Sequence, residues 1–195
     1  MIKKIGIDLD NTIINYEIPF KKFLRKNNIK LKKVNKSNLK ELINKNQKFK
    51  SWTQAQEEIY GKYIVSAKKF KYYKSFENFA LKHKFKLFII SHKTKYSQYS
   101  KKYDLHKVSN LWLKKNIKIK NYKIYFVNSI ASKLNKIKKI NPDYFIDDLN
   151  EILTNKKMPN KIKKIYFSEK NDSVIKNFEN WHKIIKFIKK NENIK

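Results

Sequence analysis

The chain contains no cysteine, so disulfide bonds, thiolate metal sites and thiolate nucleophiles are excluded. A protein without cysteine gains nothing from an oxidising compartment. No apolar stretch approaches the roughly 20 residues of a membrane span, and the N-terminus leads directly into a predicted strand instead of a signal peptide. We therefore expect a cytoplasmic protein that does not enter a membrane.

Arginine and acidic residues are also scarce. Arg25 is the single arginine among 48 basic residues, and 16 Asp and Glu leave a net charge of +32. Such a charge attracts polyanions, but proteins that read nucleic acids usually favour the planar guanidinium of arginine. The lysines are spread along the whole chain. We therefore interpret them as a solvated surface, which can still steer anionic substrates toward the protein.

The chain has two glycines and three prolines, and no linker rich in Pro, Gly or Ser divides it. With 195 residues, 41% of them hydrophobic, it can bury one sizeable core together with a small accessory module. We expect one catalytic core with an insert that is recognised by its helical pattern.

Short apolar runs predict the strands of a sheet, because each is too short for a helix and ends in polar residues. These runs are residues 2–9, 85–90, 123–127, 144–146 and 164–167. Apolar residues at helical spacing fill the segments between them, at 15–84, 105–113 and 133–140, and a closing helix is expected from Val174 to Ile188. This alternation predicts an α/β fold with a doubly wound, Rossmann-like parallel sheet.

Carboxylates follow two of the predicted strands. The string Asp8-x-Asp10-x-Thr12 follows the first strand, and Asp147-Asp148 follows the strand at 144–146. Ligands of open α/β sheets bind beyond the carboxyl ends of the strands. An Asp in this position is often only a helix cap or a turn residue. Two acidic pairs at one sheet edge, however, repel each other unless a cation binds, so we interpret them as a site.

Together with Ser91, after the strand at 85–90, and a downstream lysine, these acids resemble in order the four motifs of the haloacid dehalogenase (HAD) superfamily. Four motifs in order are more specific than D-x-D-x-T alone. The resemblance covers roughly residues 1–14 and 75–190. It implies a HAD-like catalytic core at residues 1–14 and 75–195, with residues 15–74 as a small helical cap inserted after the first strand.

The resemblance implies a role for each acid. Asp8 is the nucleophile, which forms an aspartyl-phosphate, and Asp10 is the general acid and base. A Mg²⁺ ion is held by the Asp8 carboxylate, the backbone carbonyl of Asp10 and Asp147, because this hard cation prefers oxygen ligands. Asp148 is placed ahead of Glu151 as the second acid of the fourth motif.

Three further residues bind phosphate by the same resemblance. The Ser91 hydroxyl binds the phosphoryl oxygens, Lys133 neutralises both nucleophile and phosphate, and Thr12 helps to hold the loop that carries Asp10. Lys133 best fits the start of the helix before the strand at 144–146. Three other lysines lie close by in the sequence: Lys136, Lys138 and Lys139.

The sequence departs from the family pattern at two positions. Asn11 stands where the family often has glycine, and asparagine is the substitute that best tolerates a left-handed backbone. Ile146 stands where a glycine often precedes the fourth-motif Asp. The first departure costs the resemblance little, and the second leaves Asp147 as the firmer metal ligand.

Within the superfamily, an acid at the position of Asp10 indicates phosphatases and phosphomutases, because dehalogenases and transport ATPases lack it. Nothing signals a cap that holds a bisphosphorylated intermediate, so a mutase is less favoured. We predict a Mg²⁺-dependent phosphatase, nucleotidase-like or sugar-phosphate phosphatase-like, that acts on a small phosphorylated metabolite. The alternative is a nucleic-acid-binding protein, or a phosphatase for polynucleotide ends, that uses the basic surface. The sequence leaves the oligomeric state open.

Overall fold

The computed structural model describes residues 2–32, 34–45, 51–119, 122–169 and 174–194. It divides into two compact units. The sheet unit comprises residues 1–14, 69–92 and 118–195, and the helical unit comprises residues 15–68 and 93–117.

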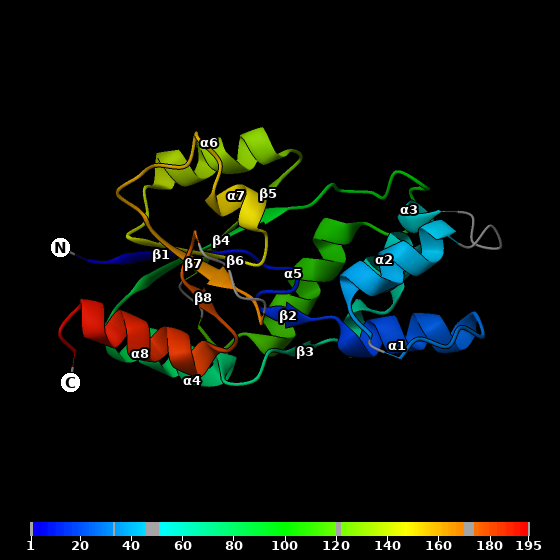
Figure 1. Ribbon diagram of the computed structural model, residues 1–195, viewed down its shortest axis with the longest axis horizontal. Coiled ribbons are helices and arrows are strands. Elements are labelled where there is room, and N and C mark those ends of the chain that lie inside the picture. The colour runs from blue at the N-terminus through cyan, green and yellow to red at the C-terminus, as the bar shows by residue number, and fades with distance from the viewer. Residues whose placement is uncertain (1, 33, 46–50, 120–121, 170–173, 195) are drawn as a thin grey trace. The chain divides into compact units, whose positions relative to one another are not determined.

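The sheet unit is built on six parallel strands in the order β5-β4-β1-β6-β7-β8 (Figure 1). Their bounds are Lys4–Ile7 for β1, Lys86–His92 for β4, Tyr122–Val127 for β5, Tyr144–Asp147 for β6, Lys163–Phe167 for β7 and Asn177–Phe178 for β8. The predicted parallel α/β sheet is confirmed. Because β1 lies between β4 and β6, the strand order reverses beside β1, which is where ligands bind in such sheets.

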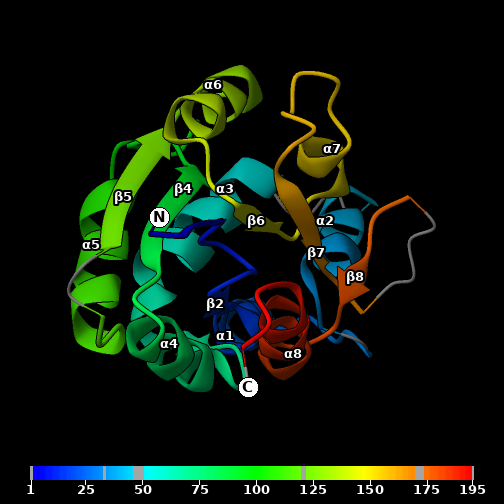
Figure 2. The ribbon, with the colours of Figure 1, turned by 90° about the vertical axis from the view of Figure 1, so that its left-hand side faces the viewer.

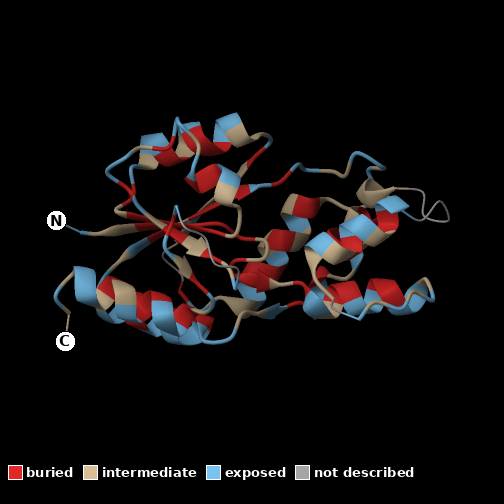
Figure 3. Cartoon of the chain, viewed as in Figure 1, coloured by how far each residue is buried: buried red, intermediate tan, exposed pale blue. Residues whose placement is uncertain are grey.

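Helices cover both faces of this sheet (Figure 2). Helices α6 (Ile130–Ile140) and α7 (Asn150–Leu153) lie on one face, and α4 (Tyr73–Lys82) and α8 (Trp181–Asn191) lie on the other. The central strands are therefore buried on both sides (Figure 3). This double cover explains why these strands read as continuous apolar runs instead of alternating ones.

The closing helix is shorter than predicted. It begins at Trp181 instead of Val174, because Asn180 caps it by accepting a hydrogen bond from the Lys183 backbone N–H at 3.0 Å. Residues 177–178 form β8, which pairs with β7. A strand of two residues carries no periodicity that could distinguish it from a helix start. The four-residue helix α7 was missed for the same reason.

The helical unit consists of short helices. They are α1 (Glu17–Lys26), α2 (Lys36–Lys45), α3 (Trp52–Gln56), the π-helix η1 (Glu57–Lys62), the 3₁₀ helix η2 (Ile64–Ser66) and α5 (Leu105–Asn116). Two strands of two residues each, β2 (Ile14–Asn15) and β3 (Lys68–Lys69), form a separate small sheet. The expected helical stretch at 15–84 also included residues 33 and 46–50, which lie outside the described residues.

The division into units differs from the predicted domain boundaries in two places. Residues 69–74, expected in the cap, belong to the sheet unit, whereas residues 93–117, expected in the core, join the helical unit. Two contacts explain the second difference. The indole Nε1 of Trp112 on α5 donates to the Ala67 carbonyl at 2.9 Å, and the buried Lys93 ammonium donates to Ser109 Oγ at 2.8 Å. In the described part of the chain, no helix combines the length and apolar character that crossing a bilayer requires.

The centre of the sheet leaves no room for a side chain at Gly6. A Cβ atom there would lie 2.6 Å from Phe145 Cδ2 and 3.3 Å from Pro142 Cγ, and Phe145 is fully buried. We expect Gly6→Ala to lower the free energy of unfolding by about 1–3 kcal/mol, as in other overpacked cores. Urea denaturation measures this. The control Lys123→Ala, at an exposed position of β5, should change it by no more than about 0.5 kcal/mol, and equal stabilities for the two variants would contradict the packing argument.

Candidate active site

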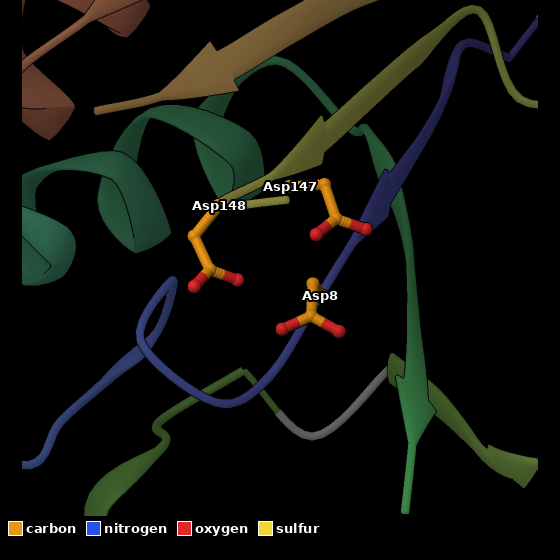
Figure 4. A group of neighbouring side chains, drawn as sticks. All are labelled: Asp8, Asp147 and Asp148. Atoms are coloured by element: carbon orange, nitrogen blue, oxygen red, sulfur yellow. The ribbon is translucent and has the colours of Figure 1, made fainter. Parts of the chain in front are cut away.

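Three carboxyl groups gather at the carboxyl ends of two neighbouring strands (Figure 4). Asp8 directly follows β1, Asp147 ends β6, and Asp148 comes next in the chain. One carboxylate oxygen of each lies within 4.8 Å of those of the other two. Asp8 and Asp147 are buried, whereas Asp148 is half-buried. The parallel pairing of β1 with β6 brings these distant parts of the sequence together.

Lys133 supplies the positive charge of this cluster. Its Nζ lies 2.5 Å from Asp8 Oδ1 and 2.7 Å from Asp147 Oδ2, and its side chain is fully buried. Ser129 caps α6 by accepting from the Ser132 backbone N–H at 3.1 Å, and Lys133 faces inward one turn later. The three alternative lysines are not buried: Lys136 lies over the Tyr125 ring, and Lys138 and Lys139 are exposed.

Burial controls the electrostatics of this group. Burial raises the pKa of the Asp8 carboxyl well above its usual value; the Lys133 ammonium opposes the rise, and the charges of Asp147 and Asp148 add to it. Burial lowers the pKa of Lys133, but attraction to Asp147 and Asp8 outweighs it, so the net shift is upward. Lys133 therefore stays charged at neutral pH.

The donor set fits a divalent cation. When ionised, the three clustered carboxylates carry three negative charges, of which Lys133 offsets one, so two remain. Oxygen ligands of this kind suit Mg²⁺. The chain has three basic residues for each acidic one, yet three of its few acids are held together out of water. A bound cation would offset the repulsion that this placement creates.

Asp10 lies in a tight turn beside the cluster. The backbone N–H groups of Ile13 and Ile14 both donate to the Leu9 carbonyl at 3.0 Å, and the Asn11 N–H donates to the Ile14 carbonyl at 2.9 Å. Asn11 has a φ of 61°, the left-handed conformation that asparagine tolerates. The Asp10 carboxyl is not one of the three clustered groups, but its charge contributes to the raised pKa of Asp8.

Two buried hydroxyl groups near the strand ends have no hydrogen-bond partner among the described residues. They are Ser91 Oγ on β4 and Thr12 Oγ1 in the turn after β1. β4 is the other neighbour of β1, and Ile7 pairs with Ile89, so Ser91 lies at the same sheet edge as Asp8. A buried polar group without a partner costs free energy, which a bound polar ligand would recover.

The structure separates the two candidates for the second acid of the fourth motif. Asp148 belongs to the carboxylate cluster, whereas Glu151 is exposed on α7 and is not part of it. Of the predicted site residues, the structure brings Asp8, Lys133, Asp147 and Asp148 together in one group. It places Ser91 and Thr12 near the same strand ends, and Asp10 in the turn beside the cluster.

One contact to this turn was not predicted. Trp181 was expected only as an apolar residue of the closing helix, yet its Nε1 donates to the Thr12 carbonyl at 3.1 Å across 169 residues of sequence. Apolar spacing does not reveal such a bond. The available signal was the residue type, because a buried tryptophan usually finds an acceptor for its indole N–H.

A hollow of about 240 Å³ within the helical unit is a second candidate site. Three of its charged groups already have partners within the unit. Lys26 Nζ lies 2.8 Å from Glu58 Oε2, and the Ser100 hydroxyl donates to Glu57. The hollow therefore offers one buried carboxylate, Glu57, whereas the carboxylate cluster gathers three carboxyl groups around a buried ammonium, so the cluster is the stronger candidate.

Comparisons with known proteins agree on the fold. No protein-family model and no curated protein matches the chain. Several solved structures do. A candidate β-phosphoglucomutase from Thermotoga maritima aligns with a TM-score of 0.60 at 10% identity, covering 97% of this chain and 99% of that one. A HAD-superfamily hydrolase of subfamily IA from Geobacter sulfurreducens aligns at 0.58 and 10%, covering 96% of each chain.

A third similar structure is a candidate HAD-type hydrolase from Bacillus subtilis bound to magnesium. It has a TM-score of 0.58 at 11% identity and covers 96% of this chain and 98% of that one. At such low identity, the likeness shows the fold alone. The chain therefore has the α/β fold found in HAD-superfamily hydrolases, as its four sequence motifs suggested.

The ion pairs of Lys133 predict a pH-dependent loss of stability in Lys133→Met. This change leaves the buried Asp8 and Asp147 without their ammonium partner, and breaking a buried pair costs about 3–5 kcal/mol. The cost should be largest at neutral pH. Because burial raises the pKa of Asp8 in the folded state, protonation relieves the unpaired charge as pH falls, and the penalty shrinks toward the unfolded-state pKa.

Urea denaturation of the wild-type protein and of Lys133→Met, in EDTA at pH 7.5 and at pH 5, tests this expectation. A matched control is Lys136→Met on the same helix, whose ammonium lies over the Tyr125 ring instead of contacting a carboxylate. A Lys133→Met deficit that is constant with pH, or equal to that of Lys136→Met, would contradict the ion-pair interpretation.

Proposed function

We propose that the protein is a Mg²⁺-dependent phosphomonoester hydrolase that works through an aspartyl-phosphate on Asp8. One observation carries the proposal: Lys133 bridges Asp8 and Asp147 inside a cluster of three carboxylates at the ligand-binding edge of the sheet. This protein shares its α/β fold with the HAD-type hydrolases described above, and that similarity supports the proposal.

The two acids of the first motif have different tasks in this proposal. The Asp8 carboxylate attacks phosphorus in line, so that an O–P bond to Asp8 forms while the P–O bond to the leaving alcohol breaks. Asp10 gives its proton to the leaving oxygen. In the second step Asp10 takes a proton from water, whose oxygen attacks phosphorus and releases phosphate and the Asp8 carboxylate.

The remaining residues stabilise the transferred group. The Lys133 ammonium offsets negative charge on the phosphoryl oxygens as well as on Asp8, and its burial strengthens this attraction. The hydroxyl groups of Ser91 and Thr12 have no hydrogen-bond partner in the described part of the chain. The Ser91 hydroxyl is therefore available to donate to a phosphoryl oxygen, and we assign Thr12 to the phosphate-binding edge together with Ser91.

Asp8, Asp147 and Asp148 are the residues that would hold Mg²⁺, with the Asp10 backbone carbonyl as a further oxygen ligand. When bound, the ion would supply two positive charges, which offset the two negative charges left on the cluster and let the site attract the phosphate monoester. The magnesium-bound hydrolase of the same fold supports this choice of cation.

We infer a small phosphorylated metabolite, such as a sugar phosphate or a nucleotide, as the substrate, with the helical unit as the cap that selects it. The similarity to a candidate β-phosphoglucomutase favours sugar phosphates within this class. The basic charge does not favour a nucleic acid. The helical unit has 21 Lys and Arg and 5 Asp and Glu, and the sheet unit has 27 and 11. Each unit therefore has a net charge of +16, so the basic charge is not confined to one unit.

The nucleophile assignment is tested by hydrolysis of p-nitrophenyl phosphate with Mg²⁺. We expect turnover by the purified protein and a loss of more than about 1,000-fold in Asp8→Asn, because the amide cannot attack phosphorus. Glu41→Gln, at an exposed position of α2, serves as the control and should retain full activity. Normal turnover by Asp8→Asn would sink the assignment, and an inactive wild type across a panel of phosphorylated metabolites would refute the proposed function.

The cation site is tested independently of activity by thermal unfolding. A ligand that binds the folded state alone raises Tm, so Mg²⁺ at roughly 100 times its Kd should add about 5 °C or more for a chain of this size. The added stability should be absent in Asp147→Asn and retained in Glu41→Gln. An equal Mg²⁺ effect on all three proteins would show that the cation binds elsewhere.

A further inference from the structure

The turn that carries Asp10 is held to the sheet unit through backbone carbonyls. Its own N–H groups are used inside the turn, where those of Ile13 and Ile14 donate to Leu9. Two carbonyls point outward instead: the Ile13 carbonyl accepts from the Phe70 backbone N–H at 3.1 Å, and the Thr12 carbonyl accepts from the Trp181 indole at 3.1 Å. Of these two contacts, only the second depends on a side chain.

Aromatic packing fixes the indole ring that makes this bond. Trp181 is fully buried, and its ring lies 4.5 Å from that of Phe76, 4.8 Å from Tyr73 and 5.5 Å from Phe167, measured between centroids. The first two rings belong to α4 and the third to β7. With neighbours on several sides, the indole cannot turn its N–H away from Thr12 without displacing them.

The helix start fixes Trp181 along the chain as well. Trp181 is the first residue of α8, directly after the cap residue Asn180, whose side chain accepts from the Lys183 N–H. The donor therefore sits at a defined place on a capped helix. Tryptophan is suited to this position because it combines a large apolar body with one N–H donor.

We propose that Trp181 is a positioning residue for the catalytic turn, which holds Thr12 so that Asp10 is aligned with the leaving oxygen of the substrate. This inference rests on the proposed phosphatase function. Removing the N–H leaves a buried carbonyl without its partner, and the turn relaxes at the residue two positions after Asp10. The loss should therefore fall on proton transfer to the leaving group.

The chain offers a matched control in its helical unit. Trp112 is also buried, and its Nε1 donates to a backbone carbonyl, that of Ala67, at 2.9 Å. Trp181→Phe and Trp112→Phe thus remove the same chemical group from the same kind of environment. Only the first of these bonds reaches the turn that carries Asp10. The two variants should lose similar amounts of stability but differ in activity.

Two substrates distinguish a positioning role from a general structural one. The p-nitrophenolate ion departs without a proton, whereas phenolate departs from phenyl phosphate far more readily when protonated. For Trp181→Phe we expect kcat/KM to fall about 10-fold or more on phenyl phosphate and less than about 3-fold on p-nitrophenyl phosphate. Asp10→Asn should show the same bias, and Trp112→Phe should show none.

The outcomes separate the two proposals. An inactive wild type overturns the phosphatase function, and the positioning role with it. An active wild type with an unaffected Trp181→Phe overturns the positioning role alone. Equal losses on both substrates, or the same losses in Trp112→Phe, also overturn it, because they indicate general damage to the fold.

A measurement on the unaltered protein applies if Trp181→Phe does not fold. The chain has three tryptophans, so the Trp181 indole N–H resonance can be assigned in an ¹⁵N spectrum by comparison with Trp52→Phe and Trp112→Phe. We expect the Trp181 indole N–H to be protected from deuterium exchange, and to shift when Mg²⁺ and orthovanadate are added as a phosphate analogue. An unprotected Trp181 resonance, or one that stays in place when orthovanadate binds, would overturn the proposal.

Discussion

The bridge from Lys133 to Asp8 and Asp147 is the interaction on which the rest of the site depends. It joins the end of β1, the end of β6 and the first turns of α6 in one buried contact. Without the ammonium, two carboxylates would lie out of water at the same sheet edge, and the pKa of Asp8, which burial already raises, would rise further. Placing that cation is therefore a condition for burying Asp8 and Asp147 together.

The topology of the sheet makes the bridge possible. Because β1 is central, its end is flanked by β4 on one side and β6 on the other, and each neighbour brings a polar residue to the same edge. Close packing under this edge is equally necessary. The absence of a side chain at Gly6 lets the Phe145 ring pack against the β1 backbone. Gly6 pairs with Phe145 in the sheet, and the next pair is Ile7 with Ile146. This sheet edge thus rests on tightly packed strands.

Sequence reasoning succeeded where a local pattern carried the information. The apolar runs predicted five of the strands, and the acids that follow two of them predicted the contents of the cluster. Lys133 was chosen from four lysines by its place on the predicted helix, and it is the one that is buried against Asp8 and Asp147. In each case, a strand end or a helix start determines where the side chain lies.

Other features depend on contacts that no local pattern encodes. The two-residue strand β8 is defined by its pairing with β7, and it shortened the predicted closing helix. Helix α5 was assigned to the core through the family resemblance, which covers residues 75–190, but the Trp112 bond to Ala67 ties it to the helical unit. The Trp181 bond to Thr12 is of the same kind, because its partners are 169 residues apart.

The lysine-rich composition and the catalytic chemistry act over different distances. Exposed lysines attract anions, but physiological salt screens them beyond about 8 Å. Lys133 differs from them because it is fully buried and bridges two carboxylates. In that environment a single charge acts more strongly than a charge in water. Strong electrostatic interaction with a ligand therefore depends on a few buried groups at one sheet edge, while the abundant surface charge affects the rate at which anions are encountered.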